Sequence, residues 1–199
     1  SEGEFCVSAT KLSELVNAFS SEQIEFELSP SALKVVSGSA KAKLPLGNTE
    51  DFPDYRHQVN GTTFYLDSGH FTDILDFART SAAPKTHSVP ILTGVNLHLE
   101  NNLCTAACTD GIRIMRANMS LDTDNQAADV TIPAVNVAII VKALKDYVGS
   151  VALVAGPQQV RIASDNIFIT SQLIEGKFPS YLNVEATETP ITISTSRAM

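Results

Sequence analysis

The chain has 199 residues, of which 44% are hydrophobic and 18% are charged, a balance typical of a folded globular protein and not of a disordered or collagen-like one. Fourteen basic against twenty-two acidic residues give a net charge of −8, which argues against a protein that binds nucleic acid by bulk positive charge. No run reaches the roughly 20 apolar residues of a membrane helix, and the first seven residues lack the basic and apolar parts of a secretory signal.

The first predicted elements are a strand, a helix and three further strands. A strand at 5–7 is followed by Ser8, a good helix N-cap. An apolar stripe with the i, i+3, i+4, i+7 spacing of an amphipathic helix comes next, formed by Leu12, Leu15, Val16 and Phe19. Strands separated by turn residues are predicted at 24–28, 33–37 and 40–46.

The same order of elements follows twice more, and its first strand appears a fourth time at 191–193. The second copy has a strand at 64–66, a helical stripe at Phe71, Ile74, Leu75 and Ala78, and strands at 91–99, 103–109 and 112–118. The third has a strand at 130–132, a stripe at Val137, Ile140, Val141 and Leu144, and strands at 151–155, 160–164 and 167–173. Asp110-Gly111 predicts a hairpin turn. The chain is therefore predicted to repeat a β-α-β-β-β unit.

A Phe-Pro-x-Tyr run closes the first unit at 52–55 and the third at 178–181, two repeats apart, so two units are predicted to form one domain. The predicted boundaries are 1–55 for the second half of a domain, 56–61 for a linker, 62–182 for a complete domain, 183–188 for a linker and 189–199 for the start of another domain. We expect the two helices of the complete domain to pack side by side, with antiparallel sheets outside them.

The cysteines are not expected to form a disulfide framework. Cys104 and Cys108 lie on one face of a predicted strand, about 13 Å apart, which is too far for a disulfide or a shared metal ion. We expect buried structural thiols in a reducing, intracellular compartment.

The repeat resembles the bacterial sliding clamp family, the beta subunit of DNA polymerase III, over essentially the whole chain. The matching runs are 89–95, 107–114, 130–133 and 173–181. The resemblance implies an α+β DNA clamp fold with two β-α-β-β-β units per domain and helices on one face of antiparallel sheets. It also implies a processivity factor without a catalytic site or cofactor.

The resemblance implies three kinds of partner: duplex DNA bound weakly and without sequence preference, the DNA polymerase III catalytic subunit with the clamp loader, and other proteins that carry a clamp-binding motif. Two chains of the family form a ring around DNA, in the cytoplasm at the nucleoid. Ring closure pairs domain one with domain three, and only the start of domain three is predicted in this sequence, so we expect a mainly monomeric protein.

The resemblance also implies a pocket for a short peptide that carries a Gln and two or three apolar side chains. The residues carried over from the matching runs are Leu92, Thr109, Gly111, Ile112, Arg113, Ile114, Pro179, Asn183 and Val184. An apolar floor is expected from Leu92, Ile114, Pro179 and Val184, with Gly111 allowing close backbone approach and Arg113 offering donors at the rim. Val89 and Asn183 stand where the family often has Arg, and Ile112 where it often has a polar or aromatic residue.

Weak DNA contact is predicted for cationic and polar side chains on the helices and one loop. They are Lys11, Arg79, Lys85, Thr86, Lys142 and Lys145. Acidic residues on the same helix faces, Glu14, Asp73 and Asp76, equally fit a solvated face of mixed charge. A ring that slides requires only weak phosphate attraction.

Other site chemistry is not favoured by the sequence. The histidines at 57, 70, 87 and 98 share no metal-ligand spacing. Asp67, Ser68 and His70 are nearly consecutive at a helix start, where a helix cap explains them better than a catalytic triad. Two alternatives remain open: a small α+β hydrolase or nucleotide-binding domain of unrelated fold, and a purely structural array.

Overall fold

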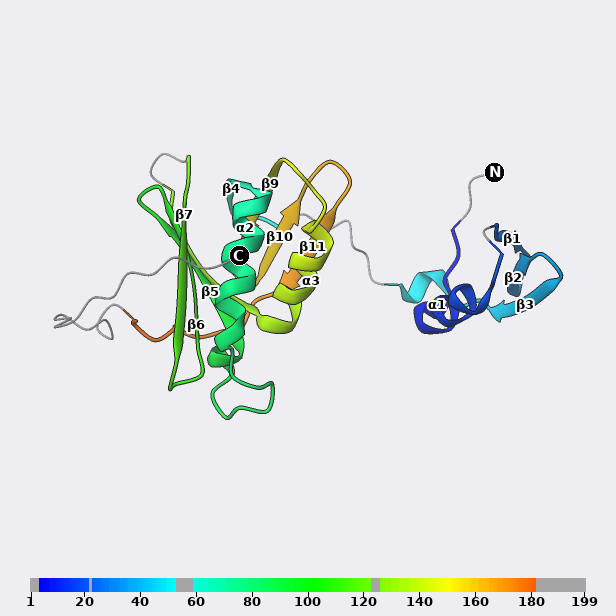
Figure 1. Cartoon of the computed structure of the whole chain (residues 1–199), viewed down its shortest axis with the longest axis horizontal. Helices are drawn as coiled ribbons and strands as arrows, with labels where there is room; N and C mark the ends of the chain where they lie inside the picture. The colour runs from blue at the N-terminus through cyan, green and yellow to red at the C-terminus, as the bar shows by residue number, and fades with distance from the viewer. Residues whose placement is uncertain (1–3, 22, 53–58, 123–125, 182–199) are drawn as a thin grey trace, which may run out of the picture. The chain divides into compact units, whose positions relative to one another are not determined.

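The computed structural model describes residues 4–21, 23–52, 59–122 and 126–181, shown in colour in Figure 1. The chain divides into two compact units, unit 1 at residues 1–57 and unit 2 at residues 58–199. No helix in these described ranges is long and apolar enough to cross a membrane.

The described part of unit 1 contains an α-helix, a 3-10 helix and a three-stranded antiparallel sheet of order β1-β2-β3. Its elements are α1 (Ala9–Ala18), β1 (Glu25–Leu28), β2 (Ala32–Ser37), β3 (Ala40–Pro45) and the 3-10 helix η1 (Thr49–Asp51). The Ser8 hydroxyl caps α1 by accepting from the Lys11 amide. The predicted strand at 5–7 was wrong, because that segment makes only a single bridge between Cys6 and Gly47.

Unit 2 has the predicted β-α-β-β-β order twice. The first repeat is β4 (Thr62–Asp67), α2 (Ser68–Ala78), η2 (Arg79–Ser81), η3 (Pro90–Thr93), β5 (Gly94–Glu100), β6 (Leu103–Thr109) and β7 (Ile114–Ser120). The second repeat is β8 (Ala128–Pro133), α3 (Ala134–Leu144), β9 (Ser150–Ala155), β10 (Gln159–Ala163) and β11 (Phe168–Gln172). The Asp67 carboxylate accepts from the His70 amide, so these residues form the expected helix cap.

The two repeats of unit 2 exchange their first strands. The sheets have the orders β11-β10-β9-β4 and β7-β6-β5-β8, so β4 joins the sheet of the second repeat and β8 joins the sheet of the first. In the antiparallel registers Phe64 lies opposite Leu153, and Val130 lies opposite Leu97. The exchange makes the two repeats one domain.

One apolar core joins both helices and both sheets of unit 2, whose ribbons Figure 1 shows. Helices α2 and α3 contact each other, as predicted, and lie against the inner faces of the sheets. The stripe residues Phe71, Ile74, Leu75, Ala78, Val137, Ile140 and Leu144 are buried, and Val141 is partly buried. Cys104 and Cys108 are fully buried in the same core as predicted, and burial raises the pKa of Cys104 to about 12 and that of Cys108 to about 11.

Two predicted strands begin two or three residues later than expected. Pro90 opens the 3-10 helix η3, so the strand predicted from residue 91 begins at Gly94. A Cβ on Gly94 would lie only 2.7 Å from the Thr131 side chain and 2.8 Å from the Ile132 carbonyl oxygen, so glycine lets β8 approach closely. The strand predicted from residue 112 begins at Ile114, because the Asp110 side chain holds the two residues before it in a turn.

Candidate functional site

The turn between β6 and β7 carries five of the predicted peptide-binding residues, and side chains fix its shape. The Asp110 carboxylate accepts from the amides of Ile112 (3.0 Å) and Arg113 (2.8 Å). The Thr109 hydroxyl donates to the Arg113 carbonyl at 2.6 Å and accepts from the Gly111 amide at 3.0 Å. Gly111 has φ +89°, a conformation that glycine adopts without strain. The turn is therefore held rigidly before any ligand arrives.

Arg113 lies within this turn, and not on a strand as predicted. Its Nε and Nη2 lie 3.1 and 2.9 Å from Asp110 Oδ2, forming a two-point ion pair. The two amides and the guanidinium hold the pKa of Asp110 well below its ordinary value of 3.8. The sequence assigned the Arg113 side chain to the pocket rim as a hydrogen-bond donor. Two of its donor nitrogens are thus directed at Asp110.

The turn presents two apolar side chains to solvent. Ile112 is 93% exposed, although its amide is held by Asp110, and Ile114 is 36% exposed at the start of β7. A fully exposed isoleucine on a rigid turn offers apolar contact area that requires no reordering of the backbone when a partner binds.

Leu92 belongs to a small apolar cluster separate from the main core. The cluster comprises Ala83, Ile91, Leu92, Ala107 and Phe178, with Ile174 and Tyr181 packed against it. Ala107 lies two residues before Thr109 on β6, so the cluster connects the β6–β7 turn to the segment that carries Pro179. Leu92 itself is only 9% exposed. Asn183 and Val184 lie outside the described residues.

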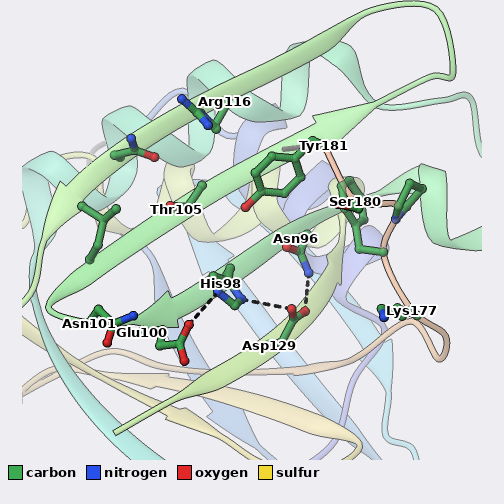
Figure 2. A pocket seen from close by; sticks show the side chains of 14 residues that line it. Asn96, His98, Glu100, Asn101, Thr105, Arg116, Asp129, Lys177, Ser180 and Tyr181 are labelled. Atoms are coloured by element: carbon green, nitrogen blue, oxygen red, sulfur yellow. Dashed lines mark hydrogen bonds and ion pairs between the residues drawn. The ribbon is translucent and has the colours of Figure 1, made fainter. Parts of the chain in front are cut away.

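A hollow of about 580 Å³, shown in Figure 2, lies on the outer face of the sheet β7-β6-β5-β8, with residues 177–181 on one side. Pro179 lines it, together with Asn96, His98, Thr105, Arg116, Asp129 and Tyr181. The sequence prediction missed this site. Its signal was the polar alternation of Asn96, His98 and Glu100 on β5, whose intervening residues are buried in the core.

The polar side chains of the hollow bind one another. Asp129 accepts from Asn96 Nδ2 at 2.7 Å and lies 3.1 Å from His98 Nδ1, and His98 Nε2 lies 3.4 Å from Glu100. Burial, and then the charge of Asp129, raise the pKa of Tyr181. Within the described part of the chain, no three His, Cys, Asp or Glu residues are grouped to hold a metal ion.

The predicted DNA-contact residues are exposed or partly exposed. Arg79 is paired with Asp76 at 2.6 Å. Lys142 and Lys145 lie at the end of α3, Lys85 and Thr86 lie in the loop between η2 and η3, and Lys11 lies on α1 of unit 1. Val135 and Ile139, both more than half exposed, share the outer side of α3. The helices of unit 2 thus present apolar side chains and an ion pair beside their lysines, which makes their surface less positively charged.

Comparison with known families shows to which family the chain belongs. Residues 66–180 match the family model described as the central domain of the DNA polymerase III beta subunit. The chain belongs to this family. The beta sliding clamp of Pseudomonas putida is 27% identical over 92% of the chain, and that of Chlamydia trachomatis is 28% identical over 98%. The chain spans about half the length of these curated relatives, 50% and 47% respectively.

Solved structures of clamps share the fold. The DNA polymerase III beta subunit of Pseudomonas aeruginosa superimposes with a TM-score of 0.85 at 22% identity, over 94% of this chain and 52% of that one. The Pseudomonas aeruginosa clamp bound to griselimycin gives a TM-score of 0.87 at 22% identity, over 94% and 51% of the two chains. These findings confirm the predicted clamp fold and family, and they do not favour the alternative of a hydrolase or nucleotide-binding domain.

Proposed function

We propose that the chain is part of a sliding clamp, a processivity factor that encircles duplex DNA and tethers the replicative polymerase, in the cytoplasm at the nucleoid, without catalytic chemistry of its own. The observation that carries this proposal is the family match over residues 66–180. The exchange of first strands supports it, because it makes unit 2 a closed domain that can serve as one segment of a ring.

The proposed partner site is the surface formed by the β6–β7 turn, η3 and Pro179. It would bind short peptides that carry a Gln and two or three apolar side chains, from the DNA polymerase III catalytic subunit, the clamp loader and other replication proteins. The rigid turn, the exposed Ile112 and Ile114, and the cluster beneath them support this assignment. Because few apolar side chains are presented, we expect micromolar to millimolar affinity, about −4 to −8 kcal/mol.

Titration of the chain with a labelled clamp-binding peptide tests the site, with Ile112→Asp as the test variant. Ile112 is 93% exposed, so the substitution leaves the fold intact, and we expect peptide affinity to fall at least about fivefold. Val148→Asp is the matched control, because Val148 is 96% exposed in the loop between α3 and β9. Equal binding by both variants and the unchanged chain would refute the site.

Two variants suggested by the sequence are less suitable. Leu92→Ala empties a buried position and would lower the free energy of unfolding by about 2–5 kcal/mol, so lost binding could reflect lost structure. A Cβ at Gly111 meets no neighbouring atom, but Gly111→Leu places a side chain at φ +89°, which strains the turn by about 1–3 kcal/mol.

The DNA contact is proposed as weak and salt-sensitive, through Lys85, Thr86, Lys142 and Lys145 in unit 2, with Lys11 and the Asp76-paired Arg79 as minor contributors. Fluorescence anisotropy of a labelled duplex at low and physiological salt tests it. We expect binding only at low salt, and we expect Lys142→Glu combined with Lys145→Glu to abolish it. Binding that does not change with salt would contradict the proposal.

A further inference from the structure

The outer face of the sheet β7-β6-β5-β8 connects the proposed partner site to the hollow. On β7, the exposed side chains of Ile114, Arg116 and Asn118 alternate with buried or partly buried ones, so all three point to the outer face. Ile114 belongs to the partner site, whereas Arg116 and Asn118 line the hollow. One strand therefore leads directly from the apolar contacts into the polar hollow.

The strand registers arrange the lining of the hollow in two rows across this face. In the first row, Arg116 lies opposite Ala107 on β6, and Ala107 lies opposite Asn96 on β5. The second row runs from β7 to β8 through Asn118, Thr105, His98 and Asp129. Arg116 is thus on the β7 side of the hollow, across from Asp129, as Figure 2 shows.

Residues 177–181 border both the partner site and the hollow. Phe178 is only 7% exposed and packs in the small apolar cluster with Leu92 and Ala107, and it also lines the hollow. Pro179 belongs to the proposed partner site and lines the hollow as well. The two surfaces are therefore contiguous.

The acidic side of the hollow is hydrogen-bonded within itself. Asp129 accepts from Asn96, which is only 1% exposed, and Asp129 and Glu100 lie 3.1 and 3.4 Å from the two ring nitrogens of His98. These contacts use acceptor positions of both carboxylates before any ligand arrives.

The cation nearest the apolar contacts is also matched, because Arg113 pairs with Asp110 inside the turn. Arg116 is the next cationic side chain along the chain, and it lines the hollow. Its field reaches the other side of the bordering segment: burial raises the pKa of Tyr181, Asp129 raises it further, and Arg116 lowers it. A ligand that enters from the partner site therefore meets the positively charged side of the hollow first.

We propose that a peptide bound at the partner site continues along the outer face of β7, and that it carries an aspartate or glutamate that pairs with Arg116. This inference rests on the proposed function and adds a requirement on the flank of the peptide, outside its Gln and its apolar side chains. An extended chain places every second side chain on one face, about 6.6 Å apart, which is also the spacing from Ile114 to Arg116. The acidic residue is therefore expected two residues beyond the terminal apolar side chain that covers Ile114.

Four labelled clamp-binding peptides test the inference on the full chain. Two carry Asp, either two residues before the first apolar side chain or two residues after the last one, and the other two carry Asn at those positions. By fluorescence anisotropy at low salt, we expect one Asp peptide to bind at least about threefold more tightly than its Asn counterpart. The preference should vanish near 1 M salt, where charges are screened beyond about 3 Å. Because the chain carries a net charge of −8, a non-specific charge effect would instead favour Asn.

Variants of the chain assign the preference to one side chain. Arg116→Gln is expected to abolish it while leaving the Asn peptide bound, because Arg116 is exposed and lies outside the apolar contacts. Arg116→Glu should reverse it, so that a Lys peptide binds more tightly than the Asp peptide. Two controls should leave it unchanged. Lys177→Gln removes the other cation that lines the hollow, and Arg161→Gln removes a cation of the other sheet, 5.0 Å from the centre of the Phe168 ring.

Three results would overturn the inference. Equal affinity for all Asp and Asn peptides, with binding still weakened by Ile112→Asp, would refute the acidic residue and leave the proposed function standing. A preference that survives Arg116→Gln, or that Lys177→Gln removes, would show that another group binds the carboxylate. Absence of any peptide binding would refute the proposed function and this inference together.

Discussion

The packing of α3 predicts that two adjacent isoleucines differ sharply in their contribution to stability. Ile140 is fully buried in the core that joins both sheets, whereas Ile139 is 59% exposed on the outer side of the helix. Truncation of a buried isoleucine to alanine removes transfer free energy and leaves a cavity, for about 2–5 kcal/mol. We expect Ile140→Ala to fall in the upper half of this range, because α2 on one side and β5 and β8 on the other limit collapse of the cavity.

The expected effect of Ile139→Ala is small and of either sign. The side chain loses little buried area, and alanine favours the helix over isoleucine by a few tenths of a kcal/mol. The two variants differ by one position on the same helix, so they have the same composition and differ only in burial.

Urea unfolding followed by far-ultraviolet circular dichroism measures both changes. At about 3 °C per kcal/mol for a domain of this size, Ile140→Ala is also expected to lower the Tm of unit 2 by roughly 10 °C or more. Ile140→Asp is expected to unfold unit 2, because an unpaired buried carboxylate costs several kcal/mol. Equal destabilisation by Ile139→Ala and Ile140→Ala, or a folded Ile140→Asp variant, would refute the packing described above.

Three further predictions follow from side-chain environments. The lowered pKa of Asp110 keeps its carboxylate ionised below pH 3.8. The contribution of this carboxylate to stability is therefore present above about pH 4 and is lost only as the pH falls through the lowered pKa. A titration midpoint near 3.8, measured by carboxyl NMR, would contradict this. In the native chain at pH 8, only Cys6 is expected to react quickly with a thiol reagent. At that pH at most about one in a thousand Cys104 or Cys108 side chains is a thiolate, the form that reacts. In urea all three cysteines should react. Gly94→Ala is expected to lower the Tm clearly, whereas Gly38→Ala meets no neighbouring atom and should show only the smaller effect of its φ of +61°; similar losses would argue against the close approach of β8.

Local patterns in the sequence predicted most of the secondary structure. The helices predicted from the stripes at 71–78 and 137–144 were correct, because the buried positions of a helix recur every three or four residues. Asp110-Gly111 correctly predicted a turn, because that turn depends on side chains close together in the sequence. The exchange of β4 and β8 was not predictable in this way, since it depends on pairing between strands that are far apart in the chain. The strand predicted at 5–7 was wrong, since that segment makes only a single bridge, between Cys6 and Gly47.

In the candidate site, too, features that depend on neighbouring residues could be predicted, and features that combine distant parts of the chain could not. Five of the candidate residues, Thr109, Gly111, Ile112, Arg113 and Ile114, lie together because they are neighbours in the sequence, but the pairing of Arg113 with Asp110 depends on how that turn folds back on itself. The outer hollow was missed because it combines Asp129 from the second repeat with Asn96 and His98 from the first. No local spacing relates those residues.

The exchange of first strands also determines when the protein can fold during synthesis. While the ribosome has released only the first repeat, β5 lacks β8 along one edge and α3 across its inner face, and β4 has no sheet to join. The apolar inner face of β5 therefore stays open to solvent and to chaperones until β8 and α3 have emerged, and β4 stays unpaired until β9 has emerged. Closing so long a segment carries a large entropic barrier, so unit 2 is expected to fold late, slowly and in one cooperative step.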